Sequence, residues 1–173
     1  GHHRQVHQLV RHPLQPLAPA QIADQRLVGQ LGRAAHAVGQ HDALEARPDV
    51  CIGLLTGNVV RGAELKLTAA GIDHRRFRLG AYGSDSAHRP ELPPIAVQRA
   101  APLFGQTPVG QQVVIIGDTP ADVTCGAALG VRAVAVATGS YDIAALEAAG
   151  AHATFPDFRA TARAVDAILA LAS

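Results

Sequence analysis

One stretch of sequence decides the fold of this chain: Val113-Val114-Ile115-Ile116-Gly117-Asp118-Thr119-Pro120-Ala121-Asp122. Its first four residues are apolar and β-branched, which is typical of a strand buried on both faces of a parallel sheet. Ligands of open α/β sheets bind at the carboxyl ends of such strands, so we expect chemistry at Asp118 and Asp122. Two carboxylates four residues apart on a tight turn can face one hard cation such as Mg²⁺, which prefers oxygen ligands. The alternative is that Asp118 only ends the strand and Asp122 stabilises the next helix, whose N-terminus favours acids.

A second apolar run lies upstream and also ends in polar residues. Cys51-Ile52-Gly53-Leu54-Leu55 leads into Thr56-Gly57-Asn58, after which a helical pattern begins. A threonine followed by glycine at the end of a buried strand can offer its hydroxyl and the loop amides to a phosphate near a helix N-terminus. Read alone, Thr56 could equally be an N-cap. Read together with Asp118 and Asp122, the segment favours a phosphate site.

Apolar runs and helical patterns alternate along the chain, which predicts an α/β fold. The predicted strands lie near 51–55, 77–81, 113–116, 132–136 and 152–155, and the predicted helices near 59–70, 92–104, 121–129, 141–149 and 158–171. Strand–helix alternation with right-handed crossovers gives a mostly parallel sheet with helices on both faces. We therefore expect a Rossmann-like, three-layer α/β domain.

These motifs resemble those of a known family. Leu54-Leu55-Thr56-Gly57-Asn58 resembles motif II of the haloacid dehalogenase-like (HAD) hydrolases, and Ile116-Gly117-Asp118-Thr119-Pro120-Ala121-Asp122 resembles motif IV. The phosphoglycolate phosphatase-like branch is the most similar. The family carries a Lys or Arg between these motifs, and the counterpart here is Arg89. The resemblance extends from about residue 43 to residue 171, and motif IV is its most specific part.

The resemblance implies a chemistry for each of these residues. It implies a Mg²⁺-dependent phosphatase acting on a small phosphorylated metabolite, with the metal held by Asp118 and by Asp122, directly or through water. Thr56 and the amides of Gly57 and Asn58 would bind phosphate oxygens, and Arg89 would neutralise the charge that develops in transfer. Such catalysis consists of positioning and electrostatic stabilisation. The sequence does not distinguish phosphatase chemistry from dehalogenase or mutase chemistry on the same scaffold.

The family's nucleophile motif, an apolar strand followed by Asp-x-Asp-x-Thr, is absent from this sequence. The acids before Thr56 are Asp24, Asp42, Glu45 and Asp49. None has a second Asp two positions on or a buried strand leading into it, so we expect none of them to be the nucleophile. We therefore expect an open strand position in the middle of the sheet, no cap domain, and a chain that is inactive as it stands. A non-catalytic relative that binds a phosphate or a partner is the alternative.

Residues 1–42 differ in composition from residues 43–173, which we expect to form a partial HAD-like core domain. The first segment holds six of the nine His and seven of the eleven Gln, with no Lys and no aromatic residue. Such a shift marks a boundary. We expect this segment to be a misframed or disordered stretch with solvated imidazoles, and we expect no physiological zinc site in it.

Composition excludes several classes of function. The formal net charge is +1 and only 3% of residues are aromatic, so we expect no nucleic-acid surface. No apolar segment is long enough for a membrane span, and no signal pattern begins the chain, so we expect no membrane partner and a cytoplasmic location. Cys51 and Cys125 lie in patterns typical of small core residues. The oligomeric state stays open.

Overall fold

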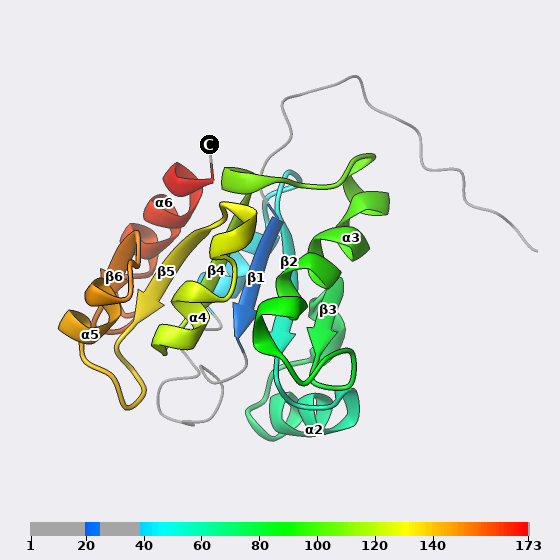
Figure 1. Cartoon of the computed structure of the whole chain (residues 1–173), viewed down its shortest axis with the longest axis horizontal. Helices are drawn as coiled ribbons and strands as arrows, with labels where there is room; N and C mark the ends of the chain where they lie inside the picture. The colour runs from blue at the N-terminus through cyan, green and yellow to red at the C-terminus, as the bar shows by residue number, and fades with distance from the viewer. Residues whose placement is uncertain (1–19, 25–38, 173) are drawn as a thin grey trace, which may run out of the picture.

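The computed structural model describes residues 20–24 and 39–172 of the chain. Six parallel strands form one sheet in the order β3-β2-β1-β4-β5-β6. The strands are β1 (Ala20–Asp24), β2 (Cys51–Thr56), β3 (Leu79–Tyr82), β4 (Val113–Gly117), β5 (Arg132–Val136) and β6 (Ala153–Phe155). All arrows in Figure 1 point toward the same edge of this sheet, which is therefore its carboxyl edge. The predicted Rossmann-like α/β fold is confirmed.

Helices cover both faces of the sheet. They are α2 (Val60–Ala69), α3 (Leu92–Phe104), α4 (Pro120–Thr124), α5 (Ile143–Ala148) and α6 (Thr161–Leu171), with the 3-10 turns η2 (His74–Arg76), η3 (Arg89–Glu91), η4 (Gly110–Gln112) and η5 (Ala127–Leu129). A further helix occupies residues 39–45. The five strands and five helices expected from sequence are therefore present, with ends that differ by a few residues.

The side chains of each strand alternate between two apolar cores. Val113 and Ile115 of β4 pack toward α3 and α4, whereas Val114 and Ile116 of the same strand pack toward α6. Each of these four side chains is at most 4% exposed. Because both faces of the strand are buried, its sequence is apolar throughout and shows no alternation with polar residues. This is why the run Val113–Ile116 was a reliable sign of a central parallel strand.

One predicted helix is divided in the structure. The pattern over residues 121–129 predicts one helix, but α4 ends at Thr124 and η5 begins at Ala127. Gly126 lies between them, and a Cβ built on it would come within 2.2 Å of Val131 and 2.5 Å of Ile115. The backbone approaches the sheet so closely here that only glycine fits, and the helix gives way to a tighter turn.

The expectation of an open strand position in the centre of the sheet was wrong. β1 fills that position, because Ala20 to Ala23 pair with β4 on one side and Ala20 to Asp24 pair with β2 on the other. Five residues with one β-branched member gave too weak a pattern to predict a strand. The other residues of the segment 1–42, up to residue 38, lie outside the described part, as do five of its six histidines. The proposed boundary at residue 42 and the absence of a cap domain stay predictions.

The order of the strands has a switch point beside β1. The chain passes from β1 to β2 and β3 on one side, and then returns to β4, β5 and β6 on the other. The order of strands therefore reverses between β1 and β4. Open α/β sheets bind ligands outside the carboxyl ends of the strands at such a reversal. Asp24 ends β1, and Asp118 directly follows β4.

Candidate functional site

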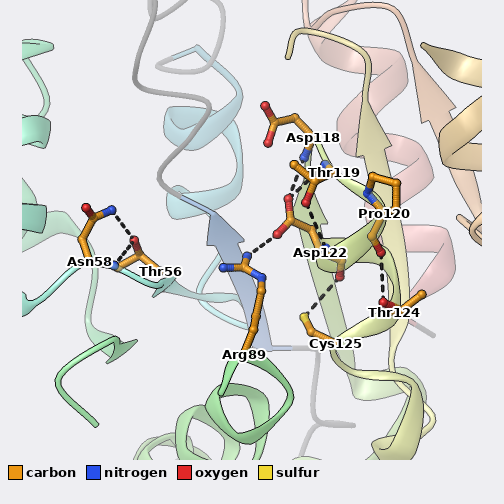
Figure 2. A network of polar contacts seen from close by, with 9 residues as sticks. All are labelled: Thr56, Asn58, Arg89, Asp118, Thr119, Pro120, Asp122, Thr124 and Cys125. Atoms are coloured by element: carbon orange, nitrogen blue, oxygen red, sulfur yellow. Dashed lines mark hydrogen bonds and ion pairs between the residues drawn. The ribbon is translucent and has the colours of Figure 1, made fainter. Parts of the chain in front are cut away.

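The turn that follows β4 holds two buried carboxylates in different ways. Asp122 is 1% exposed, and its Oδ2 accepts hydrogen bonds from the backbone amides of Asp118 (3.1 Å) and Thr119 (3.0 Å). Thr119 Oγ1 in turn accepts a hydrogen bond from the Asp122 amide at 3.2 Å, which completes a capping box at the start of α4. Asp118 is 6% exposed and its side chain points away from this turn (Figure 2). Asp122 therefore shapes the loop that presents Asp118.

Arg89 reaches this turn from the segment between β3 and α3, on the other side of β1. It begins η3, and its Nη2 forms an ion pair with Asp122 Oδ1 (Figure 2). The side chain of Arg89 is 20% exposed, so the pair is largely withdrawn from water. Both oxygens of Asp122 thus have partners within the protein, one with Arg89 and one with the loop amides. The role of Asp122 in metal binding stays a prediction.

Glycines leave the space that these carboxylates occupy. A Cβ on Gly139, in the loop after β5, would lie 2.2 Å from Asp118 Oδ2. A Cβ on Gly117 would lie 2.2 Å from the Cβ of Asp122. Any larger residue at either position would displace a carboxylate. The loop after β5 therefore belongs to the site, although no sequence motif assigned it there.

On the other side of β1, the loop after β2 holds a second set of polar groups. Thr56 is 1% exposed, and its Oγ1 accepts hydrogen bonds from the Asn58 amide at 3.1 Å and from Asn58 Nδ2 at 2.9 Å. Lys66 of α2 donates from Nζ to Asn58 Oδ1 at 2.7 Å. The contacts of Thr56 are thus those of an ordered loop, and its Oγ1 does not cap α2, whose N-cap residue is Val59.

The loop after β3 is fastened to the loop after β2. The amide of Gly83 donates to the carbonyl of Asn58 at 2.9 Å, and a Cβ on Gly83 would lie 2.0 Å from the carbonyl oxygen of Gly57. Asp85 stabilises the same loop. Its carboxylate accepts a hydrogen bond from the Tyr82 amide and forms an ion pair with Arg99 of α3 at 2.7 Å. The Arg99 guanidinium lowers the pKa of the Asp85 carboxyl. Asp85 is therefore a turn residue that orders this loop.

β1 brings a third chain segment to the same edge. Its last residue, Asp24, is in register with Leu55 of β2, and Ala23 is in register with Ile116 of β4. Asp24 therefore lies next to the residue that precedes Thr56. In Figure 2 the ribbon of β1 lies between Thr56 and Asn58 on one side and the Asp118 turn on the other. The expectation that no strand leads into any acid before Thr56 was wrong, because β1 ends at Asp24.

The sheet thus gathers every residue predicted for the site at its carboxyl edge. Thr56, Gly57 and Asn58 follow β2, Asp118 follows β4, Asp122 lies in the first turn of α4, and Arg89 reaches Asp122 from η3. Sequence reasoning missed Asp24, Lys66 and Gly139. An acid directly after a short apolar segment was the available signal for Asp24, whereas only three-dimensional contacts reveal Lys66 and Gly139.

The donor chemistry of the site is compatible with Mg²⁺. Asp118 is an acid at the reversal of strand order, and it lies next to Gly139, which has no side chain to crowd it. Asp24 is a second acid, the last residue of the neighbouring strand β1. Carboxylate oxygens of this kind are the ligands that Mg²⁺ prefers.

A different acidic cluster lies apart from this edge. His41, Asp42 and Glu45 of the helix 39–45 have ligand atoms within 4.8 Å of one another. Arg76 Nη2 forms ion pairs with both Asp42 and Glu45. The guanidinium supplies the positive charge there, so this cluster ties the helix to η2.

Two expectations from composition can be compared with the structure. Cys51 and Cys125 are buried at 2% and 5% exposure, as predicted for core residues. Within residues 20–24 and 39–172, none of the helices combines the length and the apolar character that crossing a bilayer requires.

Comparison with known proteins supports the resemblance drawn from the motifs. Residues 90–161 match the family model described as HAD-hydrolase-like. Among solved structures, a hydrolase from Pseudomonas syringae is similar with a TM-score of 0.61 and 22% identity, over 76% of this chain and 60% of that one. A predicted phosphoglycolate phosphatase from Haemophilus somnus 129PT is similar with a TM-score of 0.59 and 21% identity, over 75% of this chain and 55% of that one. No curated protein matches the sequence.

A further similar structure was solved with ligands. It is a HAD-family hydrolase from Deinococcus radiodurans R1 with bound phosphate and sodium, at a TM-score of 0.59 and 25% identity, over 79% of this chain and 59% of that one. The chain therefore spans 60% or less of the length of these three proteins. Its resemblance to HAD-like hydrolases holds for the sequence of residues 90–161 and for the architecture of the sheet.

Proposed function

We propose that this protein is a Mg²⁺-dependent phosphomonoester hydrolase of the HAD type, acting on a small phosphorylated metabolite in the cytoplasm. The observation that carries the proposal is the meeting of Thr56, Asp24 and Asp118 at the carboxyl ends of three adjacent strands, where the strand order reverses. Phosphate binding in the similar Deinococcus radiodurans hydrolase supports the same class of ligand.

Each residue has a role that follows from its position. Asp118 and Asp24 would hold Mg²⁺, which neutralises phosphate charge when bound. Thr56 and the amide of Gly57 would bind phosphate oxygens on the other side of β1, and Asn58, whose amides donate to Thr56 Oγ1, would hold the Thr56 hydroxyl in place. Arg89, fixed by Asp122, would add positive charge to the same edge. Asp24 is the carboxylate that we assign as the nucleophile toward phosphorus, because it ends the strand between these two groups.

The test is hydrolysis of a panel of small phosphate monoesters by the full chain with and without Mg²⁺. We expect phosphate release that requires Mg²⁺. Asp24→Asn and Asp118→Asn should each lower the turnover number by about 100-fold or more, as the loss of a key electrostatic group does in other enzymes. Asp73→Asn is the matched control, since Asp73 pairs with Arg75 at the exposed surface. Full turnover by either site variant would contradict the proposal.

A non-catalytic phosphate-binding protein is the second candidate, and one sequence observation favours it. The family's general acid lies two positions after the nucleophile, and that position holds Arg26 in this chain. General acid catalysis by a carboxyl group at position 26 is therefore not available. Under this alternative, calorimetry would detect orthophosphate binding in the presence of Mg²⁺ while no monoester is hydrolysed.

A further inference from the structure

We infer that Lys66 is a positioning residue for the Thr56 hydroxyl, acting through the side-chain amide of Asn58. This inference rests on the proposed function, because it assigns the phosphate-binding role to that hydroxyl. Lys66 lies on α2, eight residues after Asn58, and no sequence motif connects it with the site. The contacts that join the three side chains are short and consecutive.

Thr56 Oγ1 accepts hydrogen bonds from two groups of Asn58. A hydroxyl has two acceptor lone pairs and one proton. In both of its hydrogen bonds with Asn58, Thr56 Oγ1 is the acceptor, from the backbone amide at 3.1 Å and from Nδ2 at 2.9 Å. The hydroxyl proton is therefore directed at a group other than Asn58. In this state Thr56 acts as a hydrogen-bond donor, which is what a phosphate oxygen requires.

Lys66 sets the orientation of the Asn58 side-chain amide. A side-chain amide has a donor end and an acceptor end, and rotation by half a turn exchanges them. Lys66 Nζ lies 2.7 Å from Asn58 Oδ1. An ammonium group has three donors and no acceptor, so it can face only the oxygen end of the amide. Lys66 thereby keeps the NH₂ end of Asn58 toward Thr56.

Loss of the Lys66 ammonium would allow the Asn58 side-chain amide to reverse. With the amide reversed, its oxygen would face Thr56 Oγ1 and would accept the hydroxyl proton. Thr56 would then be used within its own loop and would no longer donate toward a phosphate. One exposed lysine on α2 thus selects whether the buried hydroxyl donates to Asn58 or is directed away from it.

The experiment compares the whole chain with Lys66→Met, and with Arg61→Gln as the matched control. Arg61 is on the same helix and forms an exposed pair with Glu64 at 3.1 Å. The first readout is the NMR signal pair of the Asn58 side-chain amide, including its contacts with the Thr56 side chain. The second is the affinity for inorganic phosphate with Mg²⁺ present, measured by calorimetry. The third is the thermal midpoint.

We expect Lys66→Met to shift the Asn58 amide signals and to remove their contacts with Thr56. Phosphate affinity should fall about tenfold, which is the size of effect given by one hydrogen bond to a charged group. Arg61→Gln should change none of the three readouts. Unchanged amide signals in Lys66→Met would overturn the inference, and so would a loss of phosphate affinity in which the amide keeps its contacts with Thr56.

Asn58→Asp provides a second test that does not depend on removing Lys66. An aspartate keeps the contact with the Lys66 ammonium but has no NH₂ group to donate to Thr56. We expect the thermal midpoint to hold while phosphate affinity falls at least tenfold. Phosphate affinity equal to that of the original chain would overturn the inference. Lys66→Arg retains a charged donor and should preserve the amide signals.

The failure of the proposed function has a different signature. If the unmodified chain binds no phosphate but Lys66→Met still releases the Asn58 amide, the proposed function fails and the positioning of Thr56 by Lys66 stands. If the chain binds phosphate and the amide is indifferent to Lys66, the proposed function stands and this inference fails.

Discussion

At the scale of single residues, the contact between Arg89 and Asp122 links two segments that are distant in sequence. Asp122 is almost fully buried, and Arg89 is its charged partner. The desolvation of two such charges is offset only while both are present. The pair therefore fixes the loop before α3 against the turn before α4, and it holds one side of the site in place.

Removing one member of this pair should cost more than removing the interaction as a whole. We expect Arg89→Met to lower the free energy of unfolding by about 3–5 kcal/mol, because it leaves a buried carboxylate without its counter-charge. The double variant Arg89→Met with Asp122→Asn should recover part of that loss, since Asn can still accept hydrogen bonds from the loop amides. Urea unfolding of the four chains in a double-mutant cycle measures both effects. Additive losses would show that the two side chains do not interact.

Gly139 gives a second prediction at this scale. Gly139→Ala places a methyl group 2.2 Å from Asp118 Oδ2, and the carboxylate must rotate away because it is the mobile end of its side chain. We expect Mg²⁺ affinity, measured by calorimetry, to fall about tenfold, equal to about 1.4 kcal/mol. Gly62→Ala on α2 is the control, since its Cβ would meet only an ordinary contact at 3.6 Å. Equal Mg²⁺ affinities in both variants would contradict the role of Gly139.

At the scale of elements, the helix 39–45 is held by Arg76 and by His41. The imidazole of His41 lies edge-on against Phe77 with ring centroids 4.9 Å apart, and its side chain is 11% exposed. Burial is the main cause that lowers the pKa of His41, and the nearby Arg76 lowers it further, while Glu45 and Asp42 act in the opposite direction. Docking of the helix therefore favours the neutral form of the imidazole more than the unfolded chain does.

The lowered pKa of His41 should make the folded chain less stable at acidic pH. The unfolded chain gains a proton on His41 near its ordinary pKa of 6.5, while the folded chain resists protonation to lower pH. The stabilising contribution is therefore complete above pH 6.5 and declines as the pH falls toward the pKa of the folded state. We expect urea midpoints to be lower at pH 5.5 than at pH 7.5, and His41→Gln to reduce the difference. His152 shares the window, because burial also lowers its pKa, so His152→Gln should remove a separate part. A pH dependence that His41→Gln leaves unchanged would exclude this origin.

At the scale of the whole molecule, β1 joins the two halves of the sheet. It pairs with β2 on one side and β4 on the other, so its backbone amides serve both neighbours. Ile22→Pro removes one of these donors from a central strand, where proline is not accommodated. We expect a loss of about 3 kcal/mol or more, and no cooperative thermal transition if the chain has ordinary stability. Ile22→Val keeps the amide and should unfold cooperatively. A cooperative transition at an unchanged temperature in Ile22→Pro would show that β1 is dispensable.

How much of this structure the sequence predicts depends on how much of each signal is local. The run Val113–Ile116 predicts its strand because burial on both faces demands four apolar residues in succession. Asp118 and Thr56 are predictable because each directly follows such a run. β1 was missed because its place in the sheet depends on pairing with distant strands, and its own five residues carry little pattern. The contact of Lys66 with Asn58 depends on how α2 turns back over its loop.

The position of β1 also has a consequence for the order of folding. Ala20 lies beside Val113 in the sheet, so the central pairing must wait until more than half of the chain is available. Pairings of such long sequence separation are slow, because the loop must close before its contacts form. Asp24 ends β1 and Asp118 directly follows β4, and these are the two strands that this step brings together. The site is thus completed only when this pairing of long sequence separation has formed, and an ion or phosphate bound across it would stabilise the sheet against opening along this seam.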